Sequence, residues 1–405
     1  MGSVEKSGRQ RTTGGLQETD TAVSSTPKAM AYVLLIINPG GTSTKVAVYR
    51  DRTPEFEETV RHGGDELGRF SGVIDQESFR LRIILDLLQD RGLELGTFSA
   101  VVGRGGALKP LSSGTYRVVP EMVADIRAGR VFVDHASNLG PLLAHDLAEK
   151  AGIPAFIVDP VSVDEFVPEA RLSGLPELER ASMSHALNLK MVCRQAAAAL
   201  GKNYQEVDLV AAHLGSGITV SAHRRGRMID VSNAVDGGPF APTRTGGLPT
   251  TGLIRLCFSG TYDRAQLLDL ATKRGGLLAY LGTSDGDEIE KRIADGDPQA
   301  RLVYDAMIVQ IAKEIGAMAA VLGGRVDAVV LTGGLACCRY LIDALKEKIS
   351  FLARVLVFPG EDEMKALALG ALRVLSGEET VRNYGALFEE DHAGSRQKFI
   401  EPEER

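Results

Sequence analysis

Two stretches of the chain share a pattern of an apolar run, a glycine turn and a second apolar run. In the first stretch, apolar residues 33–37 end at a turn, and apolar character resumes at residues 46–48. This pattern predicts two strands joined by a tight hairpin. Glycine lets a backbone approach a ligand closely, and hydroxyl and lysine side chains suit phosphate, although an ordinary hairpin with a polar tip also fits. The candidate phosphate-binding residues of this turn are Asn38, Gly40, Gly41, Thr42, Ser43, Thr44 and Lys45.

The second stretch repeats this pattern roughly 175 residues later, with strands predicted over residues 208–212 and 218–222. Two such units at this separation indicate a duplicated fold with a phosphate-gripping hairpin in each half. Further on, a strand predicted over residues 327–331 runs into a pair of glycines that suits the base or ribose of a nucleotide. The candidate residues of these two turns are His213, Gly215, Ser216, Gly217, Gly333 and Gly334.

Helical periodicity appears between the predicted strands. A helix capped by Asp75 carries Phe79, Ile83 and Leu87 at intervals of four, with Ile84 and Leu88 beside them. Further helices are predicted after Pro120, from residue 139, and over residues 363–375, and short strands over 99–102 and 155–158. Strands that alternate with helices predict an α/β fold in which polar groups at strand ends form one cleft.

Composition narrows the choice of partners. The 405 residues are 44% hydrophobic and 24% charged, with a net charge of −7, so we expect no nucleic-acid partner held by bulk electrostatics. No run approaches the ~18 apolar residues of a membrane span, and no secretion signal is visible. The four cysteines show no disulfide framework or CxxC spacing, which favours a cytoplasmic location. Residues 1–30 are predicted to be a disordered tail because they could bury almost nothing.

Eight segments together resemble the butyrate kinases, which belong to the acetate kinase branch of the superfamily that includes sugar kinases, heat-shock chaperones and actin. They occur in the order found in that family, and the resemblance covers about residues 31–380. Any one of these glycine motifs alone would be a weak signal. The segments are INPGGTSTK, VVGRGG, DHASNLG, SMSHALNLK, HLGSGITV, GGPFAPTRTGGLP, VLTGGLA and PGEDEMKALALGALRVL.

The resemblance implies two ribonuclease H-like domains of the actin-like ATPase fold, facing each other across a nucleotide cleft, and a homodimer. The first domain would comprise residues 31–162 plus about 364–385, because the final helix returns to it. The second would comprise residues 163–363, and residues 386–405 would form a loosely held tail. The implied reaction is ATP + butyrate ⇌ ADP + butyryl phosphate, with Mg²⁺.

A carboxylate substrate is already an anion, so the site needs positive charge and hydrogen-bond donors more than a general base. Arg104, in a Gly-Arg-Gly-Gly turn at a strand end, is suited to gripping both oxygens of the acid. The resemblance gives Arg244 and His185 roles at the phosphoryl group. It also makes Asp159 and Glu363 the acidic residues near metal and phosphate, with Asp159 among the catalytic groups.

The other histidines receive smaller roles. His135 and Asn138 are expected to line the site. His145, His223 and His392 are expected to be solvated.

Two departures from the family pattern stand out. Gly41 occupies a position where butyrate kinases usually carry serine, and Ala181 occupies the first of two histidine positions found in acetate kinases. Acetate, propionate and a branched acid such as isobutyrate remain alternative substrates, because one methylene changes binding by only ~1–3 kcal/mol. An ATP-driven conformational protein of the chaperone or filament type is the alternative from a different class.

Overall fold

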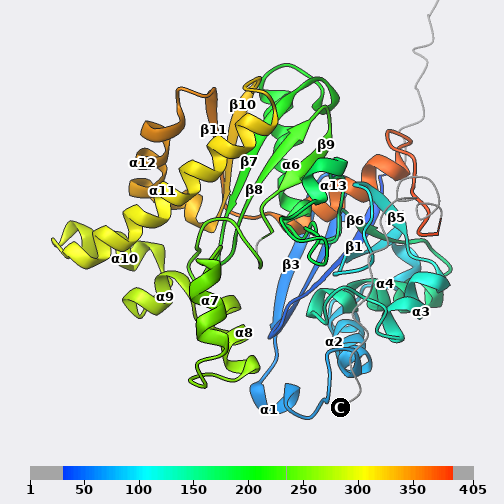
Figure 1. Cartoon of the computed structure of the whole chain (residues 1–405). Helices are drawn as coiled ribbons and strands as arrows, with labels where there is room; N and C mark the ends of the chain where they lie inside the picture. Colours follow the sequence, from blue (N-terminus) through cyan, green and yellow to red (C-terminus); the bar gives the residue numbers. More distant parts are fainter. Residues whose placement is uncertain (1–30, 234, 386–405) are drawn as a thin grey trace, which may run out of the picture. The chain divides into compact units, whose positions relative to one another are not determined.

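The computed structural model describes residues 31–233 and 235–385, so the two predicted tails, residues 1–30 and 386–405, lie outside it. The strands of the described chain form two sheets (Figure 1). The first sheet has the order β3-β2-β1-β4-β6-β5, and the second has the order β11-β10-β7-β8-β9. The first sheet contains β1 (Val33–Pro39), β2 (Ser43–Arg50), β3 (Thr53–Arg61), β4 (Ala100–Arg104), β5 (Thr115–Arg117) and β6 (Ala155–Val158). The second contains β7 (Asp208–Leu214), β8 (Ile218–Arg224), β9 (Arg227–Val231), β10 (Ala328–Gly333) and β11 (Arg354–Pro359).

The two sheets repeat one topology. In the first, β1 pairs with β2 antiparallel and with β4 parallel, and β4 pairs with β6 parallel. In the second, β7 pairs with β8 antiparallel and with β10 parallel, and β10 pairs with β11 parallel. Each hairpin that the sequence predicted is therefore the start of an equivalent sheet, which confirms the predicted duplication of an α/β unit.

Helices cover both faces of the first sheet, because its central strands are apolar on both sides. Leu35 and Ile37 pack with residues of α2, α3 and α4, whereas Leu34 and Ile36 pack with α13 on the other face. The last helix thus lies against β1, β4 and β6 although it follows the whole second sheet in the chain (Figure 1). The helices of this part are α1 (Gly64–Leu67), α2 (Glu77–Asp90), α3 (Pro120–Arg127), α4 (Leu139–Ala151) and α13 (Glu363–Leu375).

The second sheet is also covered on both faces. Val210 and Val329 pack with residues of α11 and α12, whereas Leu209 and Val330 pack with α6. None of the helices described in residues 31–233 and 235–385 is both long and apolar enough to cross a membrane. The remaining helices are α5 (Pro168–Arg171), α6 (Ala186–Ala199), α7 (Thr250–Cys257), α8 (Arg264–Thr272), α9 (Gly276–Leu281), α10 (Gly286–Ala294), α11 (Pro298–Val321) and α12 (Arg339–Ile349).

Two local predictions are corrected by the structure. The fully buried stripe of α2 is Arg80, Ile84 and Leu88, one position along from the predicted one, so an arginine faces the core. Asp75 lies in a short 3-10 turn before α2 and accepts a hydrogen bond from Gly72 N, so it does not cap the helix.

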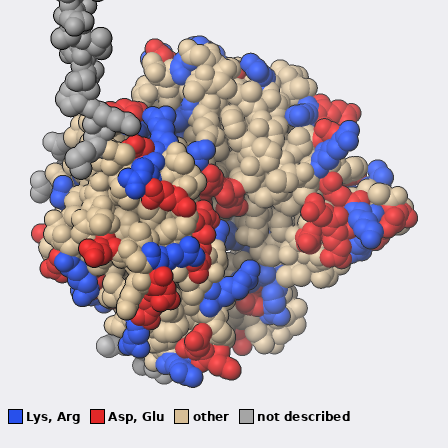
Figure 2. Space-filling model, turned by 180° about the vertical axis from the view of Figure 1, so that it is seen from behind, with Lys and Arg blue, Asp and Glu red and all other residues tan. Residues whose placement is uncertain are grey.

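The surface charge is mixed. On the face seen from behind, Lys and Arg side chains lie among Asp and Glu side chains without a continuous basic field (Figure 2). This face therefore shows no extended field of one sign.

Candidate functional site

The first hairpin turn is a polar tip with an inward and an outward side. Gly40 N donates to Ser43 O at 2.8 Å, which closes the turn. Gly41, Thr42 and Lys45 are exposed, Ser43 is half-buried and Thr44 is fully buried. The backbone and hydroxyl groups of residues 41–43 are therefore the accessible donors of this turn, while Thr44 belongs to its support.

That support is Arg80, which has no exposed surface. Its guanidinium donates to the carbonyl oxygens of Gly40 at 2.9 Å and Ser43 at 2.8 Å, and to Gly41 O at 3.2 Å. It also donates to Thr44 Oγ1, and burial lowers the pKa of Arg80. The turn is thus fixed from below by one buried cation, and the turn's outward N–H groups are left free to face a ligand.

Behind this turn, the ends of β1, β4 and the start of α13 meet. The Arg104 guanidinium forms an ion pair with the Glu363 carboxylate, and Asn38 Nδ2 donates to Glu363 Oε2 at 2.7 Å. Arg104 is 8% exposed, and its Nε is buried without a hydrogen-bond partner in the described chain. An unsatisfied guanidinium N–H at such a place is suited to an anionic ligand.

Across from this cluster, the second half contributes two histidines. The rings of His185 and His213 stack with centroids 3.9 Å apart and an interplanar angle of 11°. His185 Nδ1 lies 2.9 Å from Thr219 Oγ1, and His213 Nδ1 lies 3.0 Å from Asn188 Oδ1. Both imidazoles are therefore held in one orientation by neighbouring polar groups.

The two clusters share one site, because Glu361, two residues before Glu363, places its Oε1 3.3 Å from His213 Nε2. Burial lowers the pKa of His185 well below its ordinary value, and the nearby charges of Arg244 and Arg104 add to this effect. The same two arginines lower the pKa of His135, after the effect of its burial. His185 is accordingly neutral at pH 7 and can donate a hydrogen bond without adding a charge.

Arg244 lies against the second glycine turn. A Cβ on Gly217 would be 2.5 Å from Arg244 Nη1, so glycine is required for the guanidinium to lie there. A Cβ on Gly215 would likewise be 2.8 Å from His213 Nε2. These two glycines let a cation and an imidazole approach the turn closely.

Glu361, which the sequence did not single out as a site residue, lies beside this turn. Glu361 Oε1 lies 3.3 Å from His213 Nε2. A hydrogen bond from His213 holds the pKa of Glu361 below its ordinary value. Glu363 is held ionised in a similar way, because Arg104 and Asn38 outweigh the effect of burial and lower its pKa.

The double glycine after β10 borders an open cavity of about 430 Å³. Gly333 has φ +94°, and a Cβ there would lie 2.4 Å from Leu214 O, so this position requires glycine. Gly215, Ser216 and Gly334 line the cavity together with Glu361. The predicted turns of β7 and β10 therefore border one cavity.

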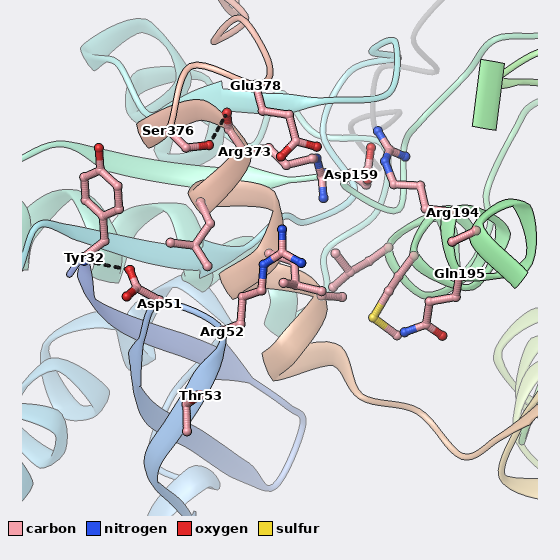
Figure 3. A pocket seen from close by; sticks show the side chains of 16 residues that line it. Tyr32, Asp51, Arg52, Thr53, Asp159, Arg194, Gln195, Arg373, Ser376 and Glu378 are labelled. Carbon is pink, nitrogen blue, oxygen red and sulfur yellow. Dashed lines mark hydrogen bonds between the residues drawn. The ribbon is translucent and has the colours of Figure 1, made fainter. Parts of the chain in front are cut away.

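Asp159 is not brought to this cluster. Its carboxylate accepts from Ser113 Oγ at 2.6 Å and from Gly114 N at 2.8 Å. It also lines a groove between α6 and α13, together with Arg194 and Arg373 (Figure 3). Among residues 31–233 and 235–385, no group of three or more His, Cys, Asp or Glu residues is arranged to hold a metal ion.

The structure also describes Asn138 and two of the three histidines that were predicted to be solvated. Asn138 is fully buried and supports the Arg104 turn by accepting from Ala107 N at 2.8 Å. His145 is half-buried, and its Nδ1 lies 3.3 Å from Asp146 Oδ1. His223 was predicted to be solvated, which is wrong: it is fully buried, with Nδ1 2.6 Å from Tyr204 Oη and Nε2 2.8 Å from Ser221 Oγ. His392 lies outside the described residues.

Comparisons with known proteins show which folds this chain resembles. Residues 180–349 match the model of the acetokinase family. Acetate kinase from Porphyromonas gingivalis is 22% identical with a TM-score of 0.70, over 85% of this chain and 100% of that one. A propionate kinase from Francisella tularensis subsp. tularensis SCHU S4 is 18% identical with a TM-score of 0.66, over 84% and 98%. Acetate kinase from Entamoeba histolytica is 16% identical with a TM-score of 0.67, over 84% and 98%. The predicted duplicated α/β fold is confirmed by these likenesses.

The Arg80 support can be tested by stability. We expect Arg80→Met to lower the free energy of unfolding by about 3 kcal/mol or more, because several buried acceptors lose their donor at ~1–3 kcal/mol each. Arg82→Met is the matched control, since Arg82 is exposed on the same helix and should change stability by less than ~0.5 kcal/mol. Denaturant unfolding measures both, and equal midpoints for the two variants would contradict the assigned support.

Proposed function

We propose that this protein is a short-chain carboxylic acid kinase that transfers a phosphoryl group from ATP to butyrate in a reversible, in-line reaction. The observation that carries this inference is Arg104, a nearly buried arginine at the end of β4 whose Nε has no partner in the described chain. The match of residues 180–349 to the acetokinase family supports the same reaction class. Acetate, propionate and a branched acid such as isobutyrate are the alternative substrates, and two acetate kinases and a propionate kinase are among the similar structures.

The charges of the site suit a carboxylate nucleophile. Arg104 would bind the acid through paired hydrogen bonds, and no proton has to be removed before attack. Arg244 and the neutral His185 would donate to the oxygens of the phosphoryl group as charge redistributes over them. With the acid already ionised, none of these groups needs to act as a general base.

The nucleotide would be held by the two glycine turns. Residues 41–43 with Lys45, and residues 213–217, would face its phosphates, and the 430 Å³ cavity beside Gly334 would receive the nucleoside. A cavity of this size lies within the range of ~300–1,000 Å³ typical of small-molecule sites. Gly41 offers no hydroxyl, so this turn would contribute backbone N–H groups there.

The residues present fit Mg²⁺ held mainly by phosphate and water rather than by a protein cage. Glu363 is the ionised carboxylate closest to the proposed substrate arginine, and Mg²⁺ commonly binds through one or two carboxylates plus substrate phosphates. Bound Mg²⁺ would neutralise phosphate charge. The position of Asp159, with its hydrogen bonds to Ser113 and Gly114, gives no support for a metal-binding or catalytic role.

We further propose that the chain acts as two domains. Residues 31–162 and about 364–385 would form one, and residues 163–363 the other, with the site between them. The packing of α13 on β1, β4 and β6 supports the return of the last helix to the first domain. A cytoplasmic location stays a prediction from the sequence.

The reaction is tested by trapping acyl phosphate as a hydroxamate, with ATP, Mg²⁺ and a panel of C2–C5 acids. We expect product with butyrate and a graded loss with shorter acids, about 10-fold or more per methylene removed. An acetate or propionate rate equal to that of butyrate would contradict butyrate as the substrate. Slow ATP hydrolysis without hydroxamate from any acid would contradict the kinase and favour an ATP-driven conformational protein.

Arg104→Ala is expected to lower kcat/KM for butyrate by 10²-fold or more, because a charged contact in a dry site supplies several kcal/mol. Arg354→Ala is the matched control, since Arg354 is exposed at the other end of its strand from the candidate site. Steady-state kinetics with circular dichroism measures both. Activity of Arg104→Ala within threefold of wild type, a change below ~1 kcal/mol, would contradict the assignment.

We also propose a homodimer, and α7 supports it. Neither α7 nor α8 contains a buried residue, and Ile254 and Phe258 are 52% and 87% exposed. Exposed apolar side chains clustered on one segment are typical of a protein interface.

Light scattering is expected to give twice the chain mass of 43.3 kDa for the wild type. The double variant Ile254→Ser with Phe258→Ser should give the monomer mass. Phe351→Ser is the control, because Phe351 is 81% exposed away from α7. A monomeric wild type, or a dimer that persists in the double variant, would contradict this interface.

A further inference from the structure

A second cavity, of about 500 Å³, lies apart from the candidate site and shares none of its residues. Its wall combines the C-terminal half of α6, the turn between β8 and β9, the end of α13 and the segment that follows α13. The cavity therefore touches elements that flank both sheets. Six cationic side chains and three acidic ones line it, and the cationic ones are Arg194, Lys202, Arg225, Arg227, Arg373 and Arg382.

Two of the three acidic residues are already paired, and the third, Glu378, cannot alone balance the remaining cationic side chains. Glu165 is already paired with the fully buried Lys190, whose Nζ lies 2.6 Å from Glu165 Oε2. Glu379 is shared between Arg373 at 2.7 Å and Arg194 at 3.7 Å. Within the described residues, no ion pair involves Arg225, Arg227 or Arg382. Three guanidinium groups thus border the cavity without an acidic partner.

Arg194 adds an unsatisfied donor. Its Nη1 is buried and has no hydrogen-bond partner in the described chain, while its guanidinium lies over the Tyr204 ring at 5.1 Å. In Figure 3, Arg194 extends from α6 and Arg373 extends from α13, on the two walls of the adjoining groove. A buried N–H without an acceptor is rare in native proteins, and an anionic oxygen would satisfy it.

The backbone conformation at Arg225 also supports an anion site in this cavity. Arg225 has φ +49° and precedes Gly226 at φ +86°, in the turn that joins β8 to β9. Asn, Asp and Gly are favoured in such a turn, and a bulkier side chain is disfavoured there. The chain nevertheless carries arginine at this position, on the wall of a cationic cavity.

We propose that this cavity binds a small polyphosphate anion, either free or as part of a larger metabolite. Several convergent guanidinium groups match an anion with two or more phosphate groups, since each can pair two oxygens. Such an anion would join Arg194 of α6 to Arg373 and Arg382 of the other wall. It would thereby connect α6, which begins beside His185, to α13, which begins at Glu363.

Calorimetric titration with inorganic tripolyphosphate tests this site. The titration uses the full chain with one molar equivalent of a non-hydrolysable ATP analogue, enough to fill the candidate nucleotide site without saturating this cavity, and with Mg²⁺ in excess over both anions. We expect one binding event in the wild type and at least a tenfold weaker Kd for the double variant Arg225→Asn with Arg382→Gln. Arg325→Gln with Arg354→Gln is the charge-matched control, since both arginines are exposed outside the cavity, and its Kd should equal that of the wild type.

A thermal melt shows whether the double variant binds more weakly only because it is less stable. Arg225→Asn suits the turn better than arginine, so the double variant should melt no lower than the wild type. No binding event in the wild type, or equal Kd values for the wild type and the double variant, would overturn the proposal. The result does not depend on kinase activity, so failure here would leave the acid panel unaffected. A parallel titration with pyrophosphate and with inorganic phosphate should give progressively weaker binding, and equal affinity for all three anions would contradict a polyphosphate site.

Discussion

The ion pair between Arg104 and Glu363 is the interaction on which the site depends. It joins the end of β4 to the start of α13, two segments that meet only because the last helix packs on the first sheet. An unpaired guanidinium at this depth would cost several kcal/mol, and removing one partner of such a pair is strongly destabilising. The pair therefore keeps a cation at the strand end, and that cation in turn helps to keep His185 and His135 neutral.

The two halves share a topology but brace their turns differently. In the first, one buried arginine holds the carbonyl oxygens, so the outward side of the turn keeps its N–H groups and hydroxyls. In the second, glycines admit the Arg244 guanidinium and the His213 imidazole directly against the backbone. The first turn thus offers backbone and hydroxyl donors beside Lys45, whereas the second brings the Arg244 guanidinium against its backbone. In the proposed nucleotide site, these different donors would face the phosphates of a nucleoside triphosphate.

Local pattern predicted the strands and most helices because apolar periodicity and glycine turns act over a few residues. The helix predicted after Pro120 is α3, and its apolar residues Met122, Val123 and Ile126 are buried. Periodicity counts only apolar positions, however, so it passed over Arg80, whose partners lie about forty residues earlier in the chain. The same limit hid His223, whose hydrogen-bonding partner Tyr204 lies 19 residues earlier in the chain. A strand-end residue such as Asp159 has two directions available, and only packing decides between them.

The structure explains why the first turn can carry glycine at position 41, where a serine hydroxyl would be expected. A Cβ there would meet nothing within 4 Å, and its φ lies outside the left-handed region. The backbone therefore does not require glycine, in contrast to Gly333 and Gly217. Since Arg80 already fixes the turn through its carbonyl groups, the turn needs no side-chain hydroxyl at position 41 to keep its shape. What glycine leaves at this exposed position is an unobstructed backbone, which lets a phosphate approach the N–H groups closely.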